Sequence, residues 1–480
     1  MMELIQKEGY ADQKKYRAYK KTVSIVDESA ISMFQGIAKD HISFLLESYD
    51  KNYDRYSFFG VDPKALVSST RKGLLIQYRD GTKEEILGNP IDALKVLFNR
   101  YDVQKDPGEL AMIGGLVGSI GYDFVRFLEI LPDENPDEIG LETIQLMLVT
   151  EFIVIDHMAE TLTAVVLDDD NAQGRVRGEK KAEELADEVF KTSLHKEAAF
   201  ARDGSIIYKT DSVTQYCDKV DRIKEYIKEG HIFQTVLSQR WTIETVQTGI
   251  ALYKELRELN PSPYLYYFNF GTFEIIGSSP EMLVKQTDQK VYTCPIAGTR
   301  RRGRTDQEDK ALAKELLEDE KERAEHVMLV DLARNDMGRI AEFGTVKVTD
   351  FMKVQNYSHV MHLVSLVEGK RREMYHPVDL ISAFLPAGTL SGAPKIRAME
   401  IIDELEEVKR GLYGGATGYL GFNGNMDFCI TIRTMIKKGN YVYLQAGAGI
   451  VADSVGESEY EECCNKVMAL AKTLVSEERL

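Results

Sequence analysis

The strongest constraint on the fold is the way strand-length apolar runs are grouped along the second half of the chain. Three such runs, at 415–423, 427–436 and 441–449, follow one another with only a few residues between them. Runs grouped in this way are typical of meanders, and helical segments separate one group from the next. This pattern favours a layered α+β fold over a doubly wound parallel sheet.

Hydrophobic periodicity predicts the other elements of the second half. Helices are predicted at 212–229, 250–258, 307–334, 377–385, 393–406 and 456–475. Further strands are predicted at 232–243, 264–270, 273–277 and 281–286. No internal repeat or low-complexity tract interrupts the pattern.

The first half of the chain also mixes strands and helices. Short apolar runs at 44–48 and 57–62 have strand length, and 111–123 is apolar and rich in glycine. The segment 143–170 holds two β-rich runs joined by a polar break, which predicts a hairpin. A charged helix followed by a polar stretch, at 177–204, is the candidate connection between two domains.

Size and composition are those of a globular enzyme. With 480 residues the chain can form two domains, which we predict at 1–200 and 201–480. The formal net charge of −17 argues against nucleic acid or an anionic membrane as the main partner. The N-terminus lacks the apolar core of a signal peptide, and no apolar run is long enough to span a membrane. We therefore expect a soluble, cytoplasmic protein.

The five cysteines show neither C-x-x-C spacing nor an even disulfide framework. They are Cys217, Cys294, Cys429, Cys463 and Cys464. Reduced thiols in a cytoplasm are the simplest interpretation. None of these cysteines has the glycine-flanked context of a glutaminase nucleophile.

Two pairs of glutamates share the spacing that places both side chains on one helix face. Glu322 and Glu325 lie three residues apart, and Glu459 and Glu462 repeat the spacing near the C-terminus, with Lys466 one turn further on. Such acids could face one divalent cation, and a site of carboxylate oxygens suits Mg²⁺ better than Zn²⁺. From spacing alone, solvated first turns of two helices remain the commoner explanation.

Six motifs in the second half favour a metal site over solvated helix turns as the explanation of these glutamates. They are "CPIAGTRRRG" (294–303), "ERAEHVMLVDLARND" (322–336), "SHVMHLVS" (358–365), "AGTLSGAPKIRAMEII" (387–402), "GLYGGATGY" (411–419) and "QAGAGIVADS" (445–454). In this order they resemble the anthranilate synthase component I family of chorismate-utilising enzymes. The first half resembles the family less densely, through "FLLES", "DRYSFFG" and "GGLVGSIGYDFVRFLE". The resemblance implies a layered α/β/β/α fold with antiparallel-rich sheets, in which an N-terminal regulatory portion packs on a C-terminal catalytic portion.

The resemblance also implies a Mg²⁺-dependent site for chorismate, which carries two carboxylates. It makes Glu325 and Glu462 direct metal ligands and gives Glu322 and Glu459 a supporting role through the waters of the ion. A cation would remove the repulsion between the paired acids and clamp the ring carboxylate.

Further positions match residues that bind the substrate in this family. Arg433, expected in a strand, and Tyr413 match the holders of the enolpyruvyl carboxylate, since the guanidinium fork suits a carboxylate. A structural ion pair is the alternative for Arg433. The other matching positions are Gly298, Thr299, Gly447, Gly449, Thr389 and Lys466. The run Arg300–Arg302 is interpreted as solvated charge.

Two matching residues carry chemistry. Glu281 matches the general acid that protonates the departing C4 hydroxyl. His362 matches a residue of the aromatising step that expels pyruvate, whereas His359 is interpreted as structural.

The nucleophile distinguishes the branches of the family. Isochorismate and salicylate synthases, which use water as the nucleophile, share a lysine at the position of Gln234. An amide cannot act as a base to activate water, so water is disfavoured as the nucleophile here. Ala297 replaces the lysine nucleophile typical of aminodeoxychorismate synthases. Direct attack of ammonia on C2 is therefore predicted, giving anthranilate. An aminodeoxychorismate synthase that lacks the lysine, or a catalytically silent ligand-binding relative, remains the alternative.

A feedback site for tryptophan is implied by "LLES" together with "NPSPY". The residues concerned are Leu46, Glu47, Ser48, Arg55, Asn260, Pro261, Ser262 and Tyr264. "NPSPY" is also good turn chemistry, and some aminodeoxychorismate synthases bind tryptophan tightly, so regulation is a hypothesis. Because no cysteine fits a glutaminase, ammonia is expected from a separate glutamine amidotransferase subunit in a hetero-oligomer.

Overall fold

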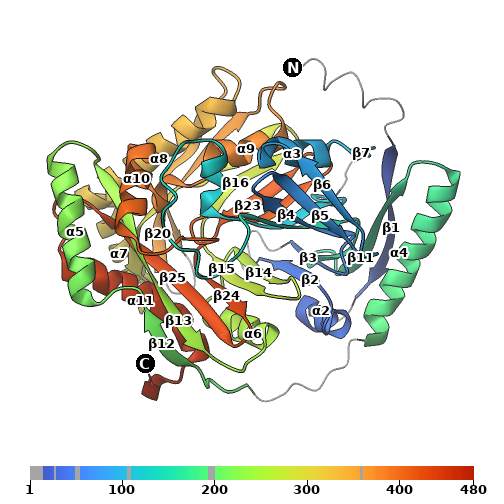
Figure 1. The fold of residues 1–480 in the computed structure, drawn as a ribbon, viewed down its shortest axis with the longest axis horizontal. Helices are drawn as coiled ribbons and strands as arrows, with labels where there is room; N and C mark the ends of the chain where they lie inside the picture. Colours follow the sequence, from blue (N-terminus) through green and yellow to red (C-terminus); the bar gives the residue numbers. More distant parts are fainter. Residues whose placement is uncertain are drawn as a thin grey trace.

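Two large sheets packed face to face form the centre of the molecule, and helices cover both outer faces (Figure 1). The computed structural model describes residues 14–25, 29–48, 55–104, 110–192, 200–356 and 360–479. In the described part of the chain the strand pairs are antiparallel, except for one parallel pair, β1 with β7. The predicted α+β class with antiparallel-rich sheets is therefore confirmed.

The first sheet contains strands from both halves of the chain. Its order is β12 (Ser205–Lys209), β13 (Gln234–Glu244), β25 (Tyr441–Ile450), β24 (Thr434–Lys438), β15 (Glu274–Ser279), β14 (Tyr264–Asn269), β2 (Ser43–Glu47), β3 (Tyr56–Val61), β10 (Glu151–Asp156), β11 (Thr161–Asp169), β1 (Lys15–Ser24) and β7 (Asp102–Val103), with β21 (Gly392–Ala393) paired to β13.

The second sheet is built in the same mixed way. Its order is β18 (Ile296–Arg301), β20 (Val360–Lys370), β17 (Lys290–Thr293), β16 (Met282–Thr287), β23 (Met426–Ile430), β22 (Ala416–Gly421), β8 (Gly115–Ile120), β9 (Ile144–Val149), β4 (Ala65–Thr70), β5 (Gly73–Tyr78) and β6 (Lys83–Leu87), with β19 (Lys347–Asn356) paired to β20. Both sheets thus cross the predicted boundary at residue 200, and the division into two domains stays a prediction.

Helices form the two outer layers. They are α2 (Ala30–Ala38), α3 (Pro90–Phe98), α4 (Ala172–Thr192), α5 (Val213–Lys228), α6 (Gly249–Leu259), α7 (Asp306–Glu318), α8 (Glu320–Ile340), α9 (Pro377–Phe384), α10 (Lys395–Leu405) and α11 (Gly456–Leu474), with short 3₁₀ turns η1 (Tyr122–Phe127), η2 (Gly388–Leu390) and η3 (Glu477–Arg479). In Figure 1, α8, α9 and α3 lie along the top of the view and α6 and α2 along the bottom.

Three hydrophobic cores hold these layers together. Between the sheets, Phe58 and Phe268 of the first sheet pack with Val117, Tyr419 and Cys429 of the second. On the outer face of the first sheet, α2, α4, α5, α6, α10 and α11 bury their apolar stripes, and α3, α8 and α9 do so on the second. Burial of apolar surface on both faces of each sheet gives the α/β/β/α layering.

The segment 307–334, predicted as one helix, is two helices, so that prediction was wrong. Asp319 has an extended backbone, with φ −68° and ψ 111°, and separates α7 from α8. Its carboxylate accepts hydrogen bonds from the backbone N–H groups of Lys321 and Glu322. An aspartate that satisfies two otherwise orphaned donors is a strong start for a new helix. It fixes where the first turn of α8 begins.

The segment 427–436 was predicted as one strand and also divides. Residues up to Ile430 belong to β23 in the second sheet, and residues from Thr434 belong to β24 in the first. Arg433 therefore lies at a crossing between sheets with a φ of 51°, and its predicted place in a strand was wrong. The sequence 427–436 looks like a single strand because β23 and β24, on either side of the break, are both extended and mostly buried.

The segment 143–170 contains three strands where two were predicted. β10 and β11 form the hairpin, whereas β9 belongs to the other sheet. The charged helix predicted from residue 177 begins earlier, as α4, and residues 193–199 of the proposed connection lie outside the described residues, as does His359.

No helix in the described ranges has both the length and the apolar character that a membrane crossing requires. All five cysteines are free thiols, in agreement with the sequence, and Cys429 and Cys463 are buried.

Candidate active site

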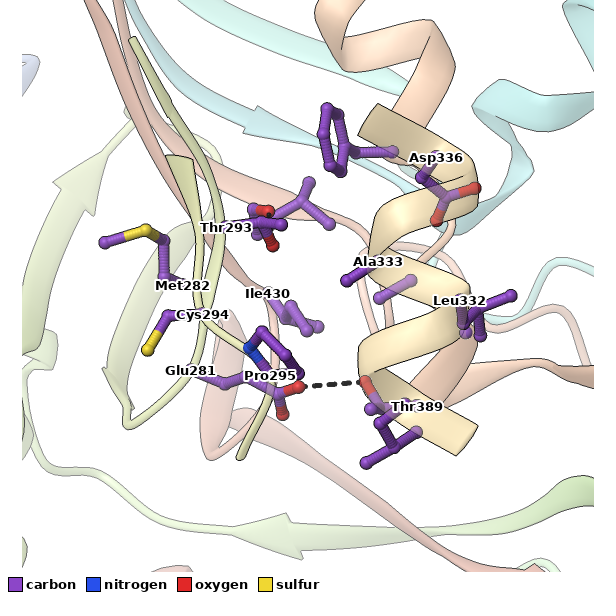
Figure 2. A pocket seen from close by; sticks show the side chains of 15 residues that line it. Glu281, Met282, Thr293, Cys294, Pro295, Leu332, Ala333, Asp336, Thr389 and Ile430 are labelled. Atoms are coloured by element: carbon purple, nitrogen blue, oxygen red, sulfur yellow. Dashed lines mark hydrogen bonds between the residues drawn. The ribbon is translucent and has the colours of Figure 1, made fainter. Parts of the chain in front are cut away.

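Glu281 lies immediately before β16 at a pocket between the sheet and α8. Its carbonyl oxygen accepts a hydrogen bond from the backbone N–H of Ile430 (2.9 Å), which fixes the backbone. Burial raises the pKa of its carboxyl to about 7, although a hydrogen bond from the Thr389 hydroxyl (3.0 Å) opposes the rise. Figure 2 shows the two side chains facing each other, with Cys294 and Leu332 on the walls of a cavity of about 40 Å³. A carboxyl with this pKa can hold and release a proton near neutrality.

His362 lies on β20 opposite Thr299 of β18. Its Nδ1 atom is 2.9 Å from the carbonyl oxygen of Gly298 and 3.1 Å from the Thr299 hydroxyl. A carbonyl oxygen can only accept, so Nδ1 carries the proton in this hydrogen bond. Burial lowers the pKa of the ring, so the neutral form, with its lone pair on Nε2, is favoured.

Gly298 links these residues to the first glutamate pair. It lies at an irregularity between β18 and β20 with a φ of 64°, a backbone region that glycine adopts without strain. A Cβ atom there would be 3.1 Å from a carboxylate oxygen of Glu322 and 2.9 Å from Leu316. The glycine therefore lets α8 approach the strand that carries Thr299.

Of the four glutamates assigned to the metal, Glu322 and Glu325 lie on α8, and Glu459 and Glu462 lie on α11. Burial raises the pKa of Glu325, and the carboxylates of Glu322 and Glu462 raise it further. Burial and the charge of Glu462 also raise the pKa of Glu459, against a hydrogen bond from Ser454. The charge of Glu462 on α11 thus acts on Glu325 of α8 as well as on Glu459 of its own helix. A set made only of carboxylate oxygens fits a hard divalent cation.

In the described residues, no three acidic, histidine or cysteine side chains already stand at ligating distance around one point. Two of the glutamates are instead held by cations of the chain. Lys466 forms an ion pair with Glu462 (2.7 Å), and the Arg300 guanidinium contacts Glu322 (3.1 Å). Two of the four carboxylates are thus paired with cations of the chain, and the four are not arranged at ligating distance around one point.

Arg300 was interpreted as part of a solvated charge run, and that interpretation was wrong. Its guanidinium bonds Glu315, the helix-capping Asp319 (2.8 Å) and Glu322. It therefore fixes the first turn of α8, which carries Glu322 of the glutamate pair. Arg301 and Arg302 likewise pair with acids of α7. The first turns of α7 and α8, which follow these arginines in the sequence, are acidic, and this could have indicated the ion pairs.

Arg433 and Lys466 line an open cavity of about 370 Å³ together with Glu462. Of the described residues, none forms an ion pair with the Arg433 guanidinium, so the structural ion pair considered from the sequence is not found. Burial lowers the pKa of Arg433, with the nearby Tyr413 opposing this. A half-buried guanidinium without a carboxylate partner is suited to bind an anionic ligand.

The predicted glycine positions on β25 touch other site residues. The Lys466 ammonium donates to the carbonyl oxygen of Gly447 (2.9 Å), and a Cβ atom at Gly447 would lie 3.0 Å from the Tyr413 hydroxyl. A Cβ atom at Gly449 would lie 2.6 Å from the amide nitrogen of Gln234. A larger side chain at either glycine would displace its neighbour.

Gln234 also lines a cavity of about 380 Å³ between α8 and the turn that follows Thr389. Among the other lining residues are Ala324, Leu329 and Gly388. The amide thus lies beside the helix that carries Glu325.

Most of the predicted tryptophan residues gather at the junction of β2 and β14. Leu46 and Glu47 pair with residues of β14 directly after Tyr264. Glu47 accepts hydrogen bonds from Tyr253 (2.6 Å) and Arg257 (3.2 Å). In the part of the chain that the structure describes, the buried Ser48 hydroxyl has no hydrogen-bond partner.

The "NPSPY" segment is fixed by its own polar groups. The Ser262 hydroxyl donates to the carbonyl of Ser279 (2.5 Å), and the Tyr264 hydroxyl donates to Asp427 (2.9 Å). Asn260, directly before Pro261, donates to the carbonyl of Ala469 on α11 (3.1 Å), which connects this segment to the helix of Glu459 and Glu462. Arg55 is exposed and pairs with Asp156 (3.0 Å). Among the described residues, no hydrogen bond or ion pair connects it to the other predicted tryptophan residues.

Comparison with known proteins gives consistent matches along almost the whole chain. The family described as chorismate binding enzyme matches residues 43–472. Anthranilate synthase component 1 of Acetivibrio thermocellus is 47% identical over 93% of each chain, and that of Pseudomonas aeruginosa is 44% identical over 94% of each. The crystal structure of anthranilate synthase component I from Streptococcus pneumoniae superposes with a TM-score of 0.76 at 37% identity, covering 87% of this chain and 92% of that one. The menaquinone-specific isochorismate synthase from Escherichia coli shares the fold, with a TM-score of 0.73 at 18% identity over 98% of each chain.

Proposed function

Because this chain belongs to the chorismate-binding enzyme family and groups with its anthranilate synthase component I members, we propose that it converts chorismate and ammonia to anthranilate and pyruvate. This reaction is the first step of tryptophan biosynthesis. The observation that carries the proposal is a shared cavity: Arg433, which has no ion-pair partner among the described residues, lines it with Lys466 and Glu462 of α11. The charge of Glu462 also acts on Glu325 of α8. A dianionic ring needs cationic groups on one side, and an acidic wall can hold its second carboxylate only across a bridging cation.

The converging acids fit a Mg²⁺ ion. Glu325 and Glu462 would hold the ion directly, and Glu322 and Glu459 would support it through water. When bound, the ion would neutralise the ring carboxylate and stabilise negative charge in the transition state. Arg433 and the Tyr413 hydroxyl would bind the enolpyruvyl carboxylate, and Lys466, Gly447, Gly449, Thr299 and Thr389 would position the ring.

Amination requires a proton for the leaving group and a place for the nucleophile. Glu281 would donate its proton to the C4 hydroxyl as ammonia attacks C2. Gln234 would orient ammonia by hydrogen bonding, because its amide is not a base. Loss of pyruvate from 2-amino-2-deoxyisochorismate then requires removal of the hydrogen at C2, and the neutral His362 can accept this proton.

The product decides between the two aminating reactions. With chorismate, Mg²⁺ and ammonium, we expect anthranilate, identified by chromatography and fluorescence. Formation of 4-aminobenzoate after addition of its lyase would instead support the aminodeoxychorismate alternative. Folded protein without turnover would support the silent ligand-binding alternative.

Replacing His362 with methionine is expected to separate the two half-reactions. Anthranilate formation should fall by about 10²-fold or more, since a positioned base contributes that much. The aminated intermediate should accumulate, because Glu281 and Gln234 are unchanged, and mass spectrometry of the reaction mixture would detect it. Unchanged anthranilate output would remove His362 from the elimination step.

Glutamine alone is expected to support no turnover by this chain. A glutamine amidotransferase subunit would supply ammonia in a hetero-oligomer. The relatives are named component 1, which supports the existence of a second component.

Tryptophan is proposed as a feedback inhibitor that binds at the junction of β2 and β14. Among the described residues the Ser48 hydroxyl has no partner, and this together with the hydrogen bond from Asn260 to α11 supports a ligand site coupled to the acidic helix. Ser48→Phe should raise the tryptophan concentration that gives half-inhibition by about tenfold or more, as expected for a coupling of 1–3 kcal/mol, with uninhibited turnover retained.

Ser43→Ala provides the matched control for the tryptophan experiment. Ser43 is the first residue of β2, the strand that ends directly before Ser48, and its hydroxyl is likewise buried without a described partner. This variant should keep normal inhibition. If Ser48→Phe is inhibited as strongly as the parent, tryptophan binds elsewhere.

A further inference from the structure

An ion pair lies buried behind the proposed substrate site. Arg410 and Glu406 are 3% and 6% exposed. The guanidinium donates twice to the carboxylate, from Nε to Oε2 (2.8 Å) and from Nη2 to Oε1 (2.6 Å). Burial alone would lower the pKa of Arg410, but the Glu406 carboxylate outweighs burial and raises it. Buried ion pairs can often be replaced by apolar residues of similar volume without loss of stability, so burial of this pair is only weak evidence for a stabilising role.

The Arg410 guanidinium binds two backbone segments that carry site residues. Its Nη1 donates to the carbonyl of Leu390 (2.6 Å), directly after Thr389, and its Nη2 donates to the carbonyl of Val236 (2.8 Å). Val236 lies two residues after Gln234 and pairs with Gly449. One side chain thus joins the turn that contacts Glu281 to the strand opposite a predicted substrate glycine.

Arg410 also supports Tyr413. Its guanidinium carbon is 5.6 Å from the centre of the Tyr413 ring and 4.7 Å from that of Tyr122. A cation near an aromatic face is attracted to the ring quadrupole. The ring of the proposed carboxylate-binding tyrosine therefore has a fixed charged neighbour on the side of the ion pair.

Glu406 extends the same arrangement to β25. It accepts hydrogen bonds from the backbone N–H (2.9 Å) and hydroxyl (2.7 Å) of Ser238, whose strand position is opposite Gly447. Gln445 of β25 donates to the Ser238 hydroxyl (2.9 Å). The carboxylate therefore holds the strand pair at the point where Lys466 contacts Gly447.

We propose that the Arg410–Glu406 ion pair is a positioning unit that sets Tyr413, the Thr389 turn and the β13–β25 strand pair in register for the substrate. The planar fork of arginine reaches two carbonyl groups and a carboxylate at once, which the single ammonium of lysine cannot do. The pair acts through these residues and does not touch the substrate. The inference rests on the proposed function, because that function makes the three segments parts of one site.

The test replaces both charges, in the variant Arg410→Met/Glu406→Met. Removing the two together leaves no unpaired buried charge, so the protein should fold. For the folded variant we expect kcat/KM for chorismate to fall by about 10²-fold, the scale of an ångström displacement in a site, with a rise in KM as Tyr413 loses its support. Arg410→Lys keeps the charge but loses the fork, and should give a smaller loss of the same kind.

The control is a second bidentate pair, Arg100–Glu84, at the far edge of the second sheet. Arg100→Met/Glu84→Met should change the unfolding temperature at most and leave KM unchanged. A purely structural Arg410–Glu406 pair would behave in the same way. If the folded Arg410→Met/Glu406→Met protein has parental KM and kcat, the proposal is overturned.

Two further measurements keep the outcome decisive. Should the double variant fail to fold, Arg410→Lys decides, since parental kinetics in that variant would refute the need for the fork. Chorismate affinity measured by calorimetry requires no turnover. If the parent protein binds chorismate but forms another product, only the proposed function is contradicted. If the parent and the double variant bind chorismate with equal affinity, the positioning role is contradicted.

Discussion

Glutamine in place of Glu325 is expected to abolish turnover and its dependence on Mg²⁺. An ion that neutralises a ring carboxylate contributes several kcal/mol to transition-state stabilisation, and each ~1.4 kcal/mol is a factor of ten. We therefore expect a loss of about 10³-fold or more, measured as initial rates over a series of Mg²⁺ concentrations. Glu462→Gln should behave in the same way, because the two residues are the proposed direct ligands.

A second measurement on Glu325→Gln does not depend on activity. Burial and the charges of Glu322 and Glu462 raise the pKa of Glu325. An acid whose pKa is raised on folding stabilises the folded state below its ordinary pKa and loses that contribution as the pH rises through the folded value. At neutral pH the charged group therefore opposes folding. Without Mg²⁺, the variant should unfold at the same or a higher temperature than the parent.

Glu320→Gln is the matched control, since Glu320 lies in the first turn of the same helix and is exposed. It should retain turnover and Mg²⁺ dependence. Near-parental rates in Glu325→Gln, with the usual response to Mg²⁺, would remove the metal from this site.

Replacing Glu281 with glutamine is expected to lower kcat/KM by about 10²–10⁴-fold, the usual contribution of a general acid. An amide preserves the size of the side chain and can accept a hydrogen bond from Thr389, but its N–H protons are not acidic enough to be transferred to the departing hydroxyl. The loss should appear in chorismate consumption as well as in anthranilate formation, because amination precedes elimination.

The pH dependence provides a separate test of Glu281. Burial raises its pKa to about 7, and the acid must be protonated to act. In the parent, kcat/KM should therefore fall as the pH rises through about 7, and this limb should be absent from the residual activity of Glu281→Gln. Met282→Leu, an apolar change of similar volume in the same pocket, should keep the limb. A parental pH profile in Glu281→Gln would assign the proton to another group.

Local patterns predicted much of the secondary structure and the helix faces that carry the glutamate pairs. The helix predicted at 456–475 is α11 (Gly456–Leu474), and the strand predicted at 441–449 is β25 (Tyr441–Ile450). Glu322 with Glu325, and Glu459 with Glu462, share helix faces because residues three apart do so in any α-helix. The resemblance to a family supplied the proposed roles of these glutamates, which stay predictions.

Contacts between residues distant in sequence decided which strands form each sheet and which side chains meet. Which sheet a strand joins depends on partners that are distant in sequence, so β23 and β24 look continuous along the chain although Arg433 carries the backbone between two sheets. The contacts of Arg410 with the carbonyl groups of Val236 and Leu390 are also long-range, although its ion-pair partner Glu406 is only four residues away.

By itself, the sequence determined the periodic elements, the α+β class and the spacing of the glutamates, since these depend on backbone geometry within a few residues. Only the tertiary structure decided that Arg433 has no carboxylate partner among the described residues, that Glu281 is desolvated, and that one buried arginine joins three parts of the site. Charge pairing and desolvation depend on which groups are brought together in space, and hydrophobic periodicity does not encode them.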